Sequence, residues 1–392
     1  MTATLAILGA TGSIGTQALD VVARHPARFE VSALSARSRL DELVALANRH
    51  HPREVVVPDA AARSAIGDAL PAGTRVLVGS EGLAEAASGS EVVLNAVVGF
   101  AGVEATLAAL AAGRHLALAN KESLVVAADL VATVRGTPGA KLLPVDSEHC
   151  AIHQCLAGLG EGFADVLRRI VITASGGPFR GRSKAELATV TVADALAHPT
   201  WQMGARITVD CSTLMNKGLE VLEATALFGV PLDRVDVVVH PQSIVHSMVE
   251  LTDGSTLAQL SNPDMRLPIA YAMGYPERTS DGFGALALDG ELVLTFEQPD
   301  LRTFRCLDLA REAGRLGGTA PAWLNAADER AVEAFLDGRI GWLDIAAVVA
   351  ATLDEYDGAP CSDLAALLSA DAAARRSADG IMEKMAALGA AR

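Results

Sequence analysis

The sequence is poor in aromatic residues and in positive charge, and each shortage excludes a class of protein. Aromatic residues make up 4% of the 392 residues, a composition that suits helices packed on a parallel sheet better than a β-sandwich. The formal net charge is −15, whereas proteins that bind nucleic acid or anionic membranes need a basic surface. We therefore expect neither partner, and any phosphorylated ligand must be bound by a local group of donors.

Cysteines are also few, and a long hydrophobic run is missing. The five cysteines are dispersed and form no Cys-x-x-Cys pair or zinc-type cluster, which indicates reduced thiols in a cytoplasm. The N-terminus leads directly into a strand and a glycine turn, so we expect no signal peptide. The most apolar window, residues 92–113, is interrupted by Asn95, Gly99 and Glu104. This window predicts strand, turn and helix instead of a membrane span.

The first 146 residues alternate between short apolar runs and helical patterns. Such alternation predicts a Rossmann-like, doubly wound parallel sheet with helices on both faces. The expected strands are Leu5–Leu8, Val31–Leu34, Val55–Val57, Val76–Val78, Val92–Val97, Leu116–Leu118 and Leu142–Val145. The chain is long enough, and at 51% hydrophobic residues apolar enough, for two or three domains with ordinary cores.

A glycine-rich turn, Gly9-Ala-Thr-Gly-Ser-Ile-Gly15, follows the first strand and precedes a helical pattern over residues 16–24. Strand, glycine turn and helix in this order are typical of a dinucleotide site, although a simple tight turn is the alternative. The second strand ends in Arg37-Ser38-Arg39 instead of an acidic residue. Guanidinium groups suit a 2′-phosphate, so we expect NADPH instead of NADH; a solvated basic loop remains the alternative.

Polar residues follow two later strands of this domain. Asn120-Lys121-Glu122 comes after one strand and Asp146-Ser147-Glu148 after another, and ligands of doubly wound sheets gather at the carboxyl ends of strands. With Glu220, the two carboxylates of the second group form an oxygen-only set that suits Mg²⁺ or Mn²⁺. The alternative is that Asp146 or Ser147 caps the next helix and Glu148 complements its dipole.

Opposite charges are concentrated in the stretch from Asn216 to Glu220. Residues 206–209 have a strand-like pattern, and a helix that starts near Ser212 would present Asn216, Lys217 and Glu220 on one face. The helix N-terminus and Lys217 suit a phosphate, whereas Glu220 suits a cation. The alternative is an amphipathic helix with an exposed Lys–Glu pair.

The region after the first domain has mixed α and β patterns. Ser175-Gly-Gly follows a strand at residues 170–173, and this sequence favours either a phosphate-sized nest of N–H groups or an ordinary turn. Residues 197–204 contain His198, Trp201 and Met203 and form a candidate lid, unless these side chains are anchored in a core. Residues 247–260 predict a β-hairpin, which is a candidate dimer edge.

The C-terminal part begins with a turn-rich connecting arm and continues with four Ala/Leu-rich helical patterns. These patterns predict a small helical bundle that supports the site. We place an NADPH-binding domain at residues 1–146, a catalytic and dimerisation domain at 147–275, the connecting arm at 276–304 and the helical domain at 305–392.

Through seven motifs, the chain resembles the 1-deoxy-D-xylulose 5-phosphate reductoisomerases over essentially its whole length. The motifs occur in the order and spacing of that family. They are Gly9-Ala-Thr-Gly-Ser-Ile-Gly15, Asn120-Lys-Glu-Ser123, Val145-Asp-Ser-Glu-His149, Ser175-Gly-Gly-Pro-Phe179, His198-Pro-Thr-Trp201, Met215-Asn-Lys-Gly-Leu-Glu220 and His240-Pro-Gln-Ser-Ile-Val-His246.

The resemblance implies a cytoplasmic homodimer of the non-mevalonate isoprenoid pathway, dependent on NADPH and on Mg²⁺, Mn²⁺ or Co²⁺. It would convert 1-deoxy-D-xylulose 5-phosphate to 2-C-methyl-D-erythritol 4-phosphate. The metal ligands implied are Asp146, Glu148 and Glu220, and the catalytic residues are Lys121, Glu148 and His198. The substrate-binding residues implied are Ser147, Glu148, Ser175, His198, Trp201, Cys211, Asn216, Lys217 and Glu220. The cofactor-binding residues implied are Thr11, Gly12, Ser13, Ile14, Ala36, Arg37, Ser38, Asn120, Glu122, Met203 and Gly204.

Two positions depart from the family pattern. Cys211 stands where the family commonly has a serine that donates to the phosphate, and a thiol is a weak donor. Ala36 replaces a usual glycine near the adenosine end of the cofactor. Two other functions stay open: another NADP-dependent oxidoreductase of a phosphorylated small molecule, or a sugar-phosphate sensor without catalysis.

Overall fold

The computed structural model describes residues 2–160, 162–201 and 203–390. Gln202, a member of the predicted lid, lies outside the described residues. The chain forms two compact units, which are described separately below. The first consists of residues 1–123, 131–154 and 264–286, and the second of residues 124–130, 155–263 and 287–392.

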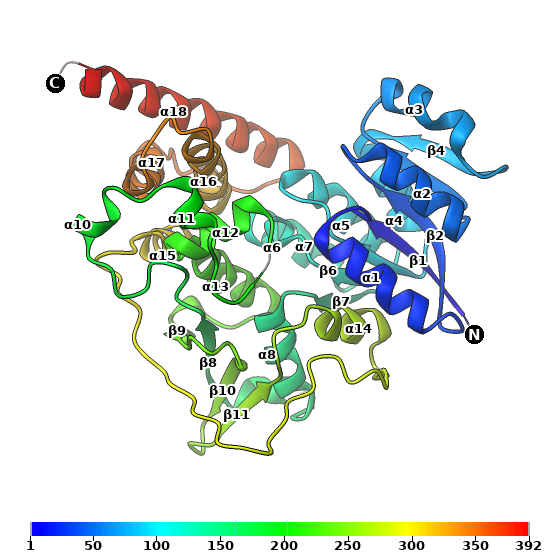
Figure 1. Ribbon diagram of the computed structural model, residues 1–392, viewed down its shortest axis with the longest axis horizontal. Coiled ribbons are helices and arrows are strands. Elements are labelled where there is room, and N and C mark those ends of the chain that lie inside the picture. Colours follow the sequence, from blue (N-terminus) through cyan, green and yellow to red (C-terminus); the bar gives the residue numbers. More distant parts are fainter. Residues whose placement is uncertain (1, 161, 202, 391–392) are drawn as a thin grey trace. The chain divides into compact units, whose positions relative to one another are not determined.

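The first unit is built on a seven-stranded sheet in which all neighbouring strands are parallel (Figure 1). Its strands are β1 (Ala3–Leu8), β2 (Phe29–Ser35), β3 (Glu54–Val57), β4 (Arg75–Val78), β5 (Val92–Asn95), β6 (His115–Leu118) and β7 (Lys141–Pro144). The central strands are short runs of Val, Leu, Ile and Ala that are buried on both faces, as expected of a parallel sheet covered by helices. The predicted doubly wound sheet is confirmed.

The strand order β4-β3-β2-β1-β5-β6-β7 reverses direction between β1 and β5, which is where doubly wound sheets bind their ligands. The glycine turn lies at this point. Gly9 has a φ of +88°, and a Cβ there would lie 2.5 Å from the carbonyl oxygen of Ala96, just after β5. Only glycine allows both this conformation and this close approach.

Helices connect the strands of this sheet, and a distant segment completes the unit. In chain order the helices are α1 (Ser13–Arg24), α2 (Leu40–His50), α3 (Ala60–Ile66), η1 (Gly67–Ala69), α4 (Gly79–Gly89), η2 (Phe100–Gly102), α5 (Val103–Ala111), α6 (Lys121–Val126), α7 (Ala128–Val134), α8 (Ser147–Ala157) and α14 (Arg266–Gly274). Helix α14 packs against α1 and β6, and the side chain of His115 bonds the carbonyl oxygen of Ala272 at 2.7 Å.

The second unit contains a four-stranded mixed sheet of order β11-β10-β8-β9. Its strands are β8 (Leu167–Ala174), β9 (Val235–Val239), β10 (Val245–Leu251) and β11 (Thr256–Leu260). Strands β8 and β9 are parallel, whereas β10 is antiparallel to both β8 and β11. The β10–β11 pair is the predicted hairpin, and the mixed α and β character is confirmed.

The remaining helices of the second unit include a C-terminal bundle in which α18 lies along α16 and α17 (Figure 1). They are α9 (Phe163–Val166), α10 (Lys184–Leu187), α11 (Val192–Leu196), α12 (Ala205–Thr213), α13 (Met215–Phe228), η3 (Leu232–Arg234), α15 (Cys306–Leu316), α16 (Ala320–Leu336), α17 (Trp342–Asp354) and α18 (Leu364–Ala390). The four predicted C-terminal helical segments are confirmed, although α18 begins seven residues before the predicted segment at 371–387.

One prediction about local structure is wrong: residues 206–209 belong to helix α12 and not to a strand. Their β-branched residues favour a strand locally, but tertiary contacts such as the bond from Arg206 to Glu329 at 2.7 Å override this preference. Thr208 donates its hydroxyl to the carbonyl oxygen of Gly204 within the first turn, at 2.8 Å. Leu214, with a φ of +63°, ends α12 and precedes α13. The helix that carries Asn216, Lys217 and Glu220 therefore starts at Met215 and not near Ser212.

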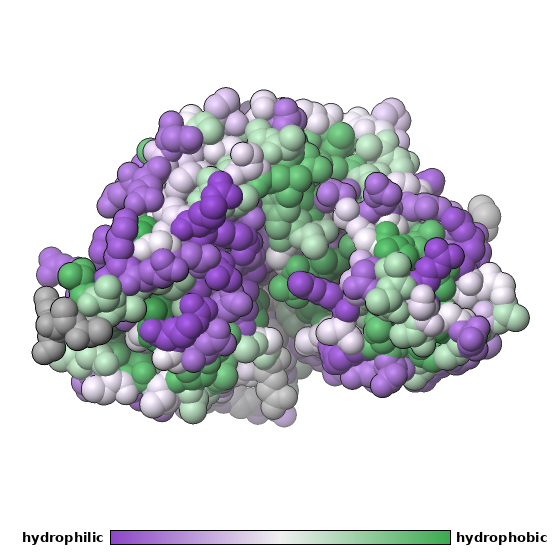
Figure 2. Space-filling view, turned by 90° about the horizontal axis from the view of Figure 1, so that it is seen from above, coloured by the Kyte–Doolittle hydropathy of each residue, from purple (hydrophilic) through white to green (hydrophobic). Residues whose placement is uncertain are grey.

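Hydrophilic side chains cover most of the face drawn in Figure 2, and apolar side chains gather there in separate patches. None of the described helices is both long and apolar enough to cross a membrane.

Helices α13 and α15 approach most closely at Gly218. A Cβ at Gly218 would lie 2.5 Å from the Cβ of Ala310, so Gly218→Ala should destabilise the protein by about 1–3 kcal/mol through overpacking. Gly380→Ala on α18 is the control, because a Cβ there meets nothing within 4 Å. It should be neutral or stabilising by up to about 1 kcal/mol. Chemical denaturation measures both, and equal stabilities of the two variants would contradict the packing.

Candidate functional site

The predicted cofactor residues of the glycine turn lie at the start of α1. Gly12 is the N-cap of α1, and the first turn contains Ser13 and Ile14 but no acidic residue. The positive end of the helix is therefore not neutralised by a carboxylate of its own first turn. Backbone N–H groups at such an end bind phosphate groups, and the contact of this turn with a pyrophosphate stays a prediction.

The end of β2 is a short exposed loop. Ala36 is buried, whereas Arg37 and Ser38 are exposed, and Arg39 forms an ion pair with Glu42 at 3.2 Å. Both Arg37 and Ser38 are therefore accessible to a ligand at the carboxyl edge of the sheet. Their contact with a 2′-phosphate stays a prediction.

Asn120 and Glu122 hold the loop that follows β5. The Asn120 amide donates to the carbonyl oxygens of Val97 and Gly99 and to Glu122, each at 2.8 Å. Glu122 accepts from the N–H of Gly99 at 3.2 Å. Both side chains are buried. In this structure they shape the switch-point loop, and their direct contact with the cofactor stays a prediction.

Asp146 caps helix α8, as the alternative interpretation proposed. Its Oδ1 accepts from the N–H groups of Glu148 and His149, at 3.1 and 3.2 Å, and lies 2.8 Å from Nδ1 of His149. Its Oδ2 accepts a short bond from the ammonium of Lys121. Capping engages one oxygen only. The other oxygen is neutralised by the Lys121 ammonium, so this carboxylate already holds one cationic group.

Glu148 lies close to Asp146 and offers a second carboxylate. The two carboxylates have oxygens within 4.8 Å of one another, and Glu148 accepts from the Ser147 hydroxyl at 2.6 Å. Paired oxygen ligands without a cysteine fit a hard divalent cation. Lys121, Asp146, Ser147 and Glu148 thus form one polar group at the carboxyl ends of β6 and β7.

In the second unit, Glu220 lies at the centre of a buried group on α13. It accepts from the amide of Asn216 at 2.6 Å and from the ammonium of Lys217 at 2.5 Å. Glu220 is 0% exposed and Lys217 5% exposed. The prediction that the three side chains share one face is confirmed. The alternative of an exposed pair is wrong, because both charges are buried.

Ser175 and His198 meet at the end of β8. The Nδ1 atom of His198 accepts from the N–H groups of Thr200 and Trp201, at 3.1 and 2.9 Å, so a neutral ring carries its proton on Nε2. Nε2 then donates to Ser175 Oγ at 3.1 Å. Burial, followed by the positive charge of Lys217, lowers the pKa of His198.

The Ser-Gly-Gly segment forms a tight loop against α12. Gly176 and Gly177 have φ values of +85° and +67°, conformations that favour glycine, and the Gly177 N–H donates to Ser175 Oγ at 3.2 Å. A Cβ at Gly177 would lie 2.7 Å from the carbonyl oxygen of Cys211. The loop and Cys211 are therefore neighbours, as the predicted phosphate pocket requires.

Two side chains of the predicted lid contact residues outside it. His198 bonds Ser175, and the ring of Trp201 lies 6.3 Å from that of His246, while Met203 is half-buried and Gly204 caps α12.

His240 is a structural residue. Both ring nitrogens bond backbone groups, and the ring stacks on Phe296 at 4.7 Å.

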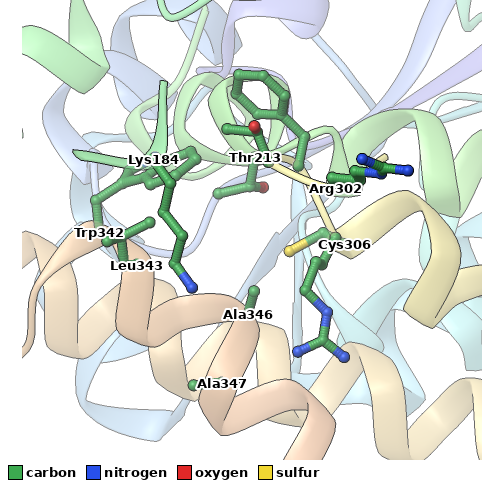
Figure 3. A pocket seen from close by; sticks show the side chains of 11 residues that line it. Lys184, Thr213, Arg302, Cys306, Trp342, Leu343, Ala346 and Ala347 are labelled. Atoms are coloured by element: carbon green, nitrogen blue, oxygen red, sulfur yellow. The ribbon is translucent and has the colours of Figure 1, made fainter. Parts of the chain in front are cut away.

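Sequence reasoning did not find a cavity of about 100 Å³ in the second unit (Figure 3). Lys184 and the thiol of Cys306 project into it. Its lining residues are Lys184, Thr213, Arg302, Thr303, Phe304, Arg305, Cys306, Trp342, Leu343, Ala346 and Ala347. No carboxylate belongs to these described lining residues, so this cavity is not the metal site. It lies beside the segments that carry the phosphate loop, because Trp342 contacts Phe179 and donates to Ser212 at 2.8 Å.

The Rossmann-like unit with its glycine turn, followed by a unit of buried charges and phosphate-sized loops, is the organisation of an NADP-dependent oxidoreductase. Comparison with protein families agrees. The model for 1-deoxy-D-xylulose 5-phosphate reductoisomerase matches residues 5–128. Two models for C-terminal domains of the same enzyme match residues 142–228 and 260–377. The chain belongs to the 1-deoxy-D-xylulose 5-phosphate reductoisomerase family.

Individual relatives extend over nearly the whole chain. The 1-deoxy-D-xylulose 5-phosphate reductoisomerase of Xanthomonas campestris pv. campestris (strain 8004) is 53% identical over 380 residues, 96% of each chain. The solved structure of the Zymomonas mobilis enzyme in complex with NADPH has a TM-score of 0.91 and 44% identity, covering 98% of this chain and 100% of that one. A DOX-P reductoisomerase in complex with NADPH, fosmidomycin and magnesium has a TM-score of 0.92 and 43% identity, covering 98% and 99%.

The His198 environment gives a prediction about pH. Its pKa should lie below the ordinary 6.5, and the charge-balanced variant Lys217→Met/Glu220→Gln should raise it, because the neighbouring cation is gone. The raised value should stay below 6.5, since burial is the larger cause. Histidine NMR titration measures this. His50, whose pKa is lowered by burial and by Arg49, is the internal control and should not move. An unchanged His198 would contradict the electrostatic account.

Proposed function

We propose that this chain converts 1-deoxy-D-xylulose 5-phosphate to 2-C-methyl-D-erythritol 4-phosphate with NADPH and a divalent cation, in isoprenoid precursor synthesis. Membership of the family supports the reaction, and the relatives solved with NADPH and with magnesium support the cofactors. The observation within this chain that supports it best is the buried Asn216–Lys217–Glu220 group, which provides donors for a phosphate and a ligand for a cation on one helix.

Asp146, Glu148 and Glu220 are the proposed metal ligands. The donor set fits a hard cation, since it consists of carboxylate oxygens and two of the three carboxylates already have oxygens within 4.8 Å of one another. Lys121 and Lys217 neutralise Asp146 and Glu220 in this structure. With a divalent cation bound, Asp146, Glu148 and Glu220 would hold it, and Lys121 and Lys217 would bond oxygens of the substrate.

Ser175, His198, Asn216 and Lys217 are the proposed phosphate donors. Ser175 Oγ accepts from His198 and from Gly177, so its own hydrogen is directed elsewhere and can be donated to an anion. Lys217 adds the positive charge. Cys211 lies beside this loop, and its thiol is a weaker donor than the serine common in the family. Trp201 covers the bound substrate as part of the lid, together with Met203.

The glycine turn and the end of β2 form the proposed NADPH site. The N–H groups of Gly12, Ser13 and Ile14, next to Thr11, bind the pyrophosphate, and Arg37 and Ser38 bind the 2′-phosphate beside Ala36. Asn120 and Glu122 hold the neighbouring loop, and Met203 and Gly204 are further proposed cofactor-binding residues. NADPH supplies the hydride and the divalent cation supplies Lewis acidity toward neighbouring oxygens.

The residues of the chain bind, orient and exclude water. Lys121, Ser147 and Glu148 would contact the oxygens at the reacting carbons, and Glu148 would accept the proton of a substrate hydroxyl. His198 in its neutral form keeps a hydrogen bond donor at the phosphate without adding a titrating charge at neutral pH. Binding of the remote phosphate closes the lid and keeps the reacting centre dry.

The oxidation of NADPH on addition of 1-deoxy-D-xylulose 5-phosphate, with Mg²⁺ or Mn²⁺ and then with a chelator, tests this function. We expect oxidation that the chelator abolishes. Oxidation that is insensitive to chelation would favour another NADP-dependent oxidoreductase, and binding of the sugar phosphate without oxidation would favour a sensor.

Glu220→Gln keeps the shape of the side chain and removes the charge that the cation needs. Turnover should fall at least about 100-fold, since Lewis acid catalysis contributes several kcal/mol. NADPH binding, followed by cofactor fluorescence, should be unchanged. Glu312→Gln, an exposed position on α15, is the control and should retain full activity. Normal turnover of Glu220→Gln would remove Glu220 from the metal site.

The finer assignments of partner and location are also proposals: a homodimer in the cytoplasm. None of the five cysteines, all of which lie in the described part of the chain, forms a disulfide, which suits a reducing compartment. Strand β11 is an edge strand whose Leu257 and Leu260 are 37% and 40% exposed, and exposed apolar edges favour pairing. Light scattering should give twice the chain mass of 40.5 kDa, and Leu257→Lys should give the monomer. A monomeric wild type would contradict the dimer.

A further inference from the structure

A group of charged side chains lies between helices α12 and α16, apart from the residues proposed to bind substrate. Asp328 of α16 is 0% exposed and Asp210 of α12 is 4% exposed. No described residue donates a hydrogen bond to either carboxyl oxygen of Asp328, and the negative charge of Asp210 acts on this carboxyl group. A buried carboxylate that accepts no hydrogen bond is costly in its charged form, so the protonated form of Asp328 is favoured and its proton needs an acceptor.

The positive charge near this pair is sufficient to stabilise only one of its two carboxyl groups in the ionised form. Arg206 lies 3.7 Å from Asp210, but it also donates to Glu329 at 2.7 Å and to Asn325 at 3.0 Å. Burial, followed by the negative charge of Asp210, raises the pKa of Asp328. The other titratable groups around the pair are Glu329 on α16, Cys306 on α15, and Asp371 and Arg375 on α18.

None of these neighbouring groups supplies the positive charge that would let both carboxyl groups of the pair ionise. Arg375 bonds Glu329 and Asp371, and although burial opposes it, the charges of Arg206 and Arg375 lower the pKa of Glu329. Glu329 therefore neutralises much of the positive charge of Arg206 and Arg375. Burial and then Asp328 raise the pKa of the Cys306 thiol, so this thiol is neutral and supplies no counter-charge.

Helix α12 is the surface on which the phosphate loop rests. A Cβ at Gly177 would lie 2.7 Å from the Cys211 carbonyl oxygen and 3.2 Å from Cα of Ser212, so the loop has almost no clearance above α12. The other end of α12 begins at Ala205, directly after the lid segment. A displacement of α12 must therefore move the loop of Ser175 as well.

We propose that Asp210 and Asp328 share one proton, and that this pair is a positioning device that fixes α12 beneath the phosphate loop. Neither residue touches the substrate, so both are positioning residues. The part that concerns substrate binding rests on the proposed function, whereas the shared proton does not.

The first test measures the proton without using activity. The folded protein holds a proton on the pair that the unfolded chain has released above about pH 5, so raising the pH favours unfolding. Only wild type releases this proton on unfolding, because the amide of Asp328→Asn keeps the hydrogen bond and binds no proton. The unfolding constant of wild type, divided by that of Asp328→Asn, should therefore rise up to tenfold per pH unit between pH 5 and 8. Asp337→Asn, at the exposed C-terminal end of α16, is the control and should follow wild type. A ratio that is independent of pH would overturn the shared proton.

The second test measures positioning. Asp328→Leu removes the hydrogen bond and should raise the KM for 1-deoxy-D-xylulose 5-phosphate about tenfold, with kcat and the KM for NADPH changed less than twofold. Asp328→Asn should restore the KM to within twofold of wild type, because its amide donates to Asp210. An unchanged KM in folded Asp328→Leu would overturn the positioning role. If that variant does not fold, Asp210→Asn, which also keeps a donor and an acceptor in the pair, should retain the wild-type KM, and a tenfold rise would overturn the role.

Discussion

Two opposite charges buried on one helix, Lys217 and Glu220, constrain the chemistry of the second unit. Removing charges from water is costly, and losing one partner of a buried ion pair typically destabilises a protein by about 3–5 kcal/mol. The lysine and the carboxylate therefore stabilise each other as long as no ligand is bound. A ligand that replaces one of them must bring the opposite charge with it, and a sugar phosphate together with a divalent cation meets this condition.

The first unit repeats this arrangement with Lys121 and Asp146. In both places an ammonium group occupies the position where the proposed mechanism needs positive charge. The pairing also explains how a chain with a net charge of −15 can hold a phosphate: the binding groups are local, buried and already oriented. The His198 ring adds a donor at this site, and its lowered pKa keeps it neutral.

The C-terminal bundle gives this site its rigidity. Trp342 donates to Ser212, α15 packs against α13 at Gly218, and Arg206 of α12 donates to Glu329 and Asn325 of α16. Three helices of the bundle therefore contact α12, which lies against the phosphate loop, and α13, which carries two of the proposed phosphate donors. These contacts agree with the sequence prediction that the bundle supports the site. The proposed shared proton of Asp210 and Asp328 adds a further link between α12 and α16.

Local patterns were sufficient for much of the fold. The parallel sheet, the glycine turn after β1 and the β10–β11 hairpin depend on periodicity and turn residues close together in the sequence, and they were predicted correctly. The strand predicted at residues 206–209 was wrong, because the contacts that make it helical come from residues more than 100 positions away, such as Glu329. The same distance hid the Asp210–Asp328 pair and the cavity at Lys184. The burial of Lys217 was also not predictable, since helical periodicity places side chains on a face but does not say what covers it.

The binding of Mn²⁺, followed by electron paramagnetic resonance, tests the proposed pairing of carboxylates most directly. Wild type should bind one ion per chain, and Asp146→Asn, Glu148→Gln and Glu220→Gln should each weaken binding at least about tenfold. Equal Mn²⁺ affinity in wild type and all three variants would contradict the account.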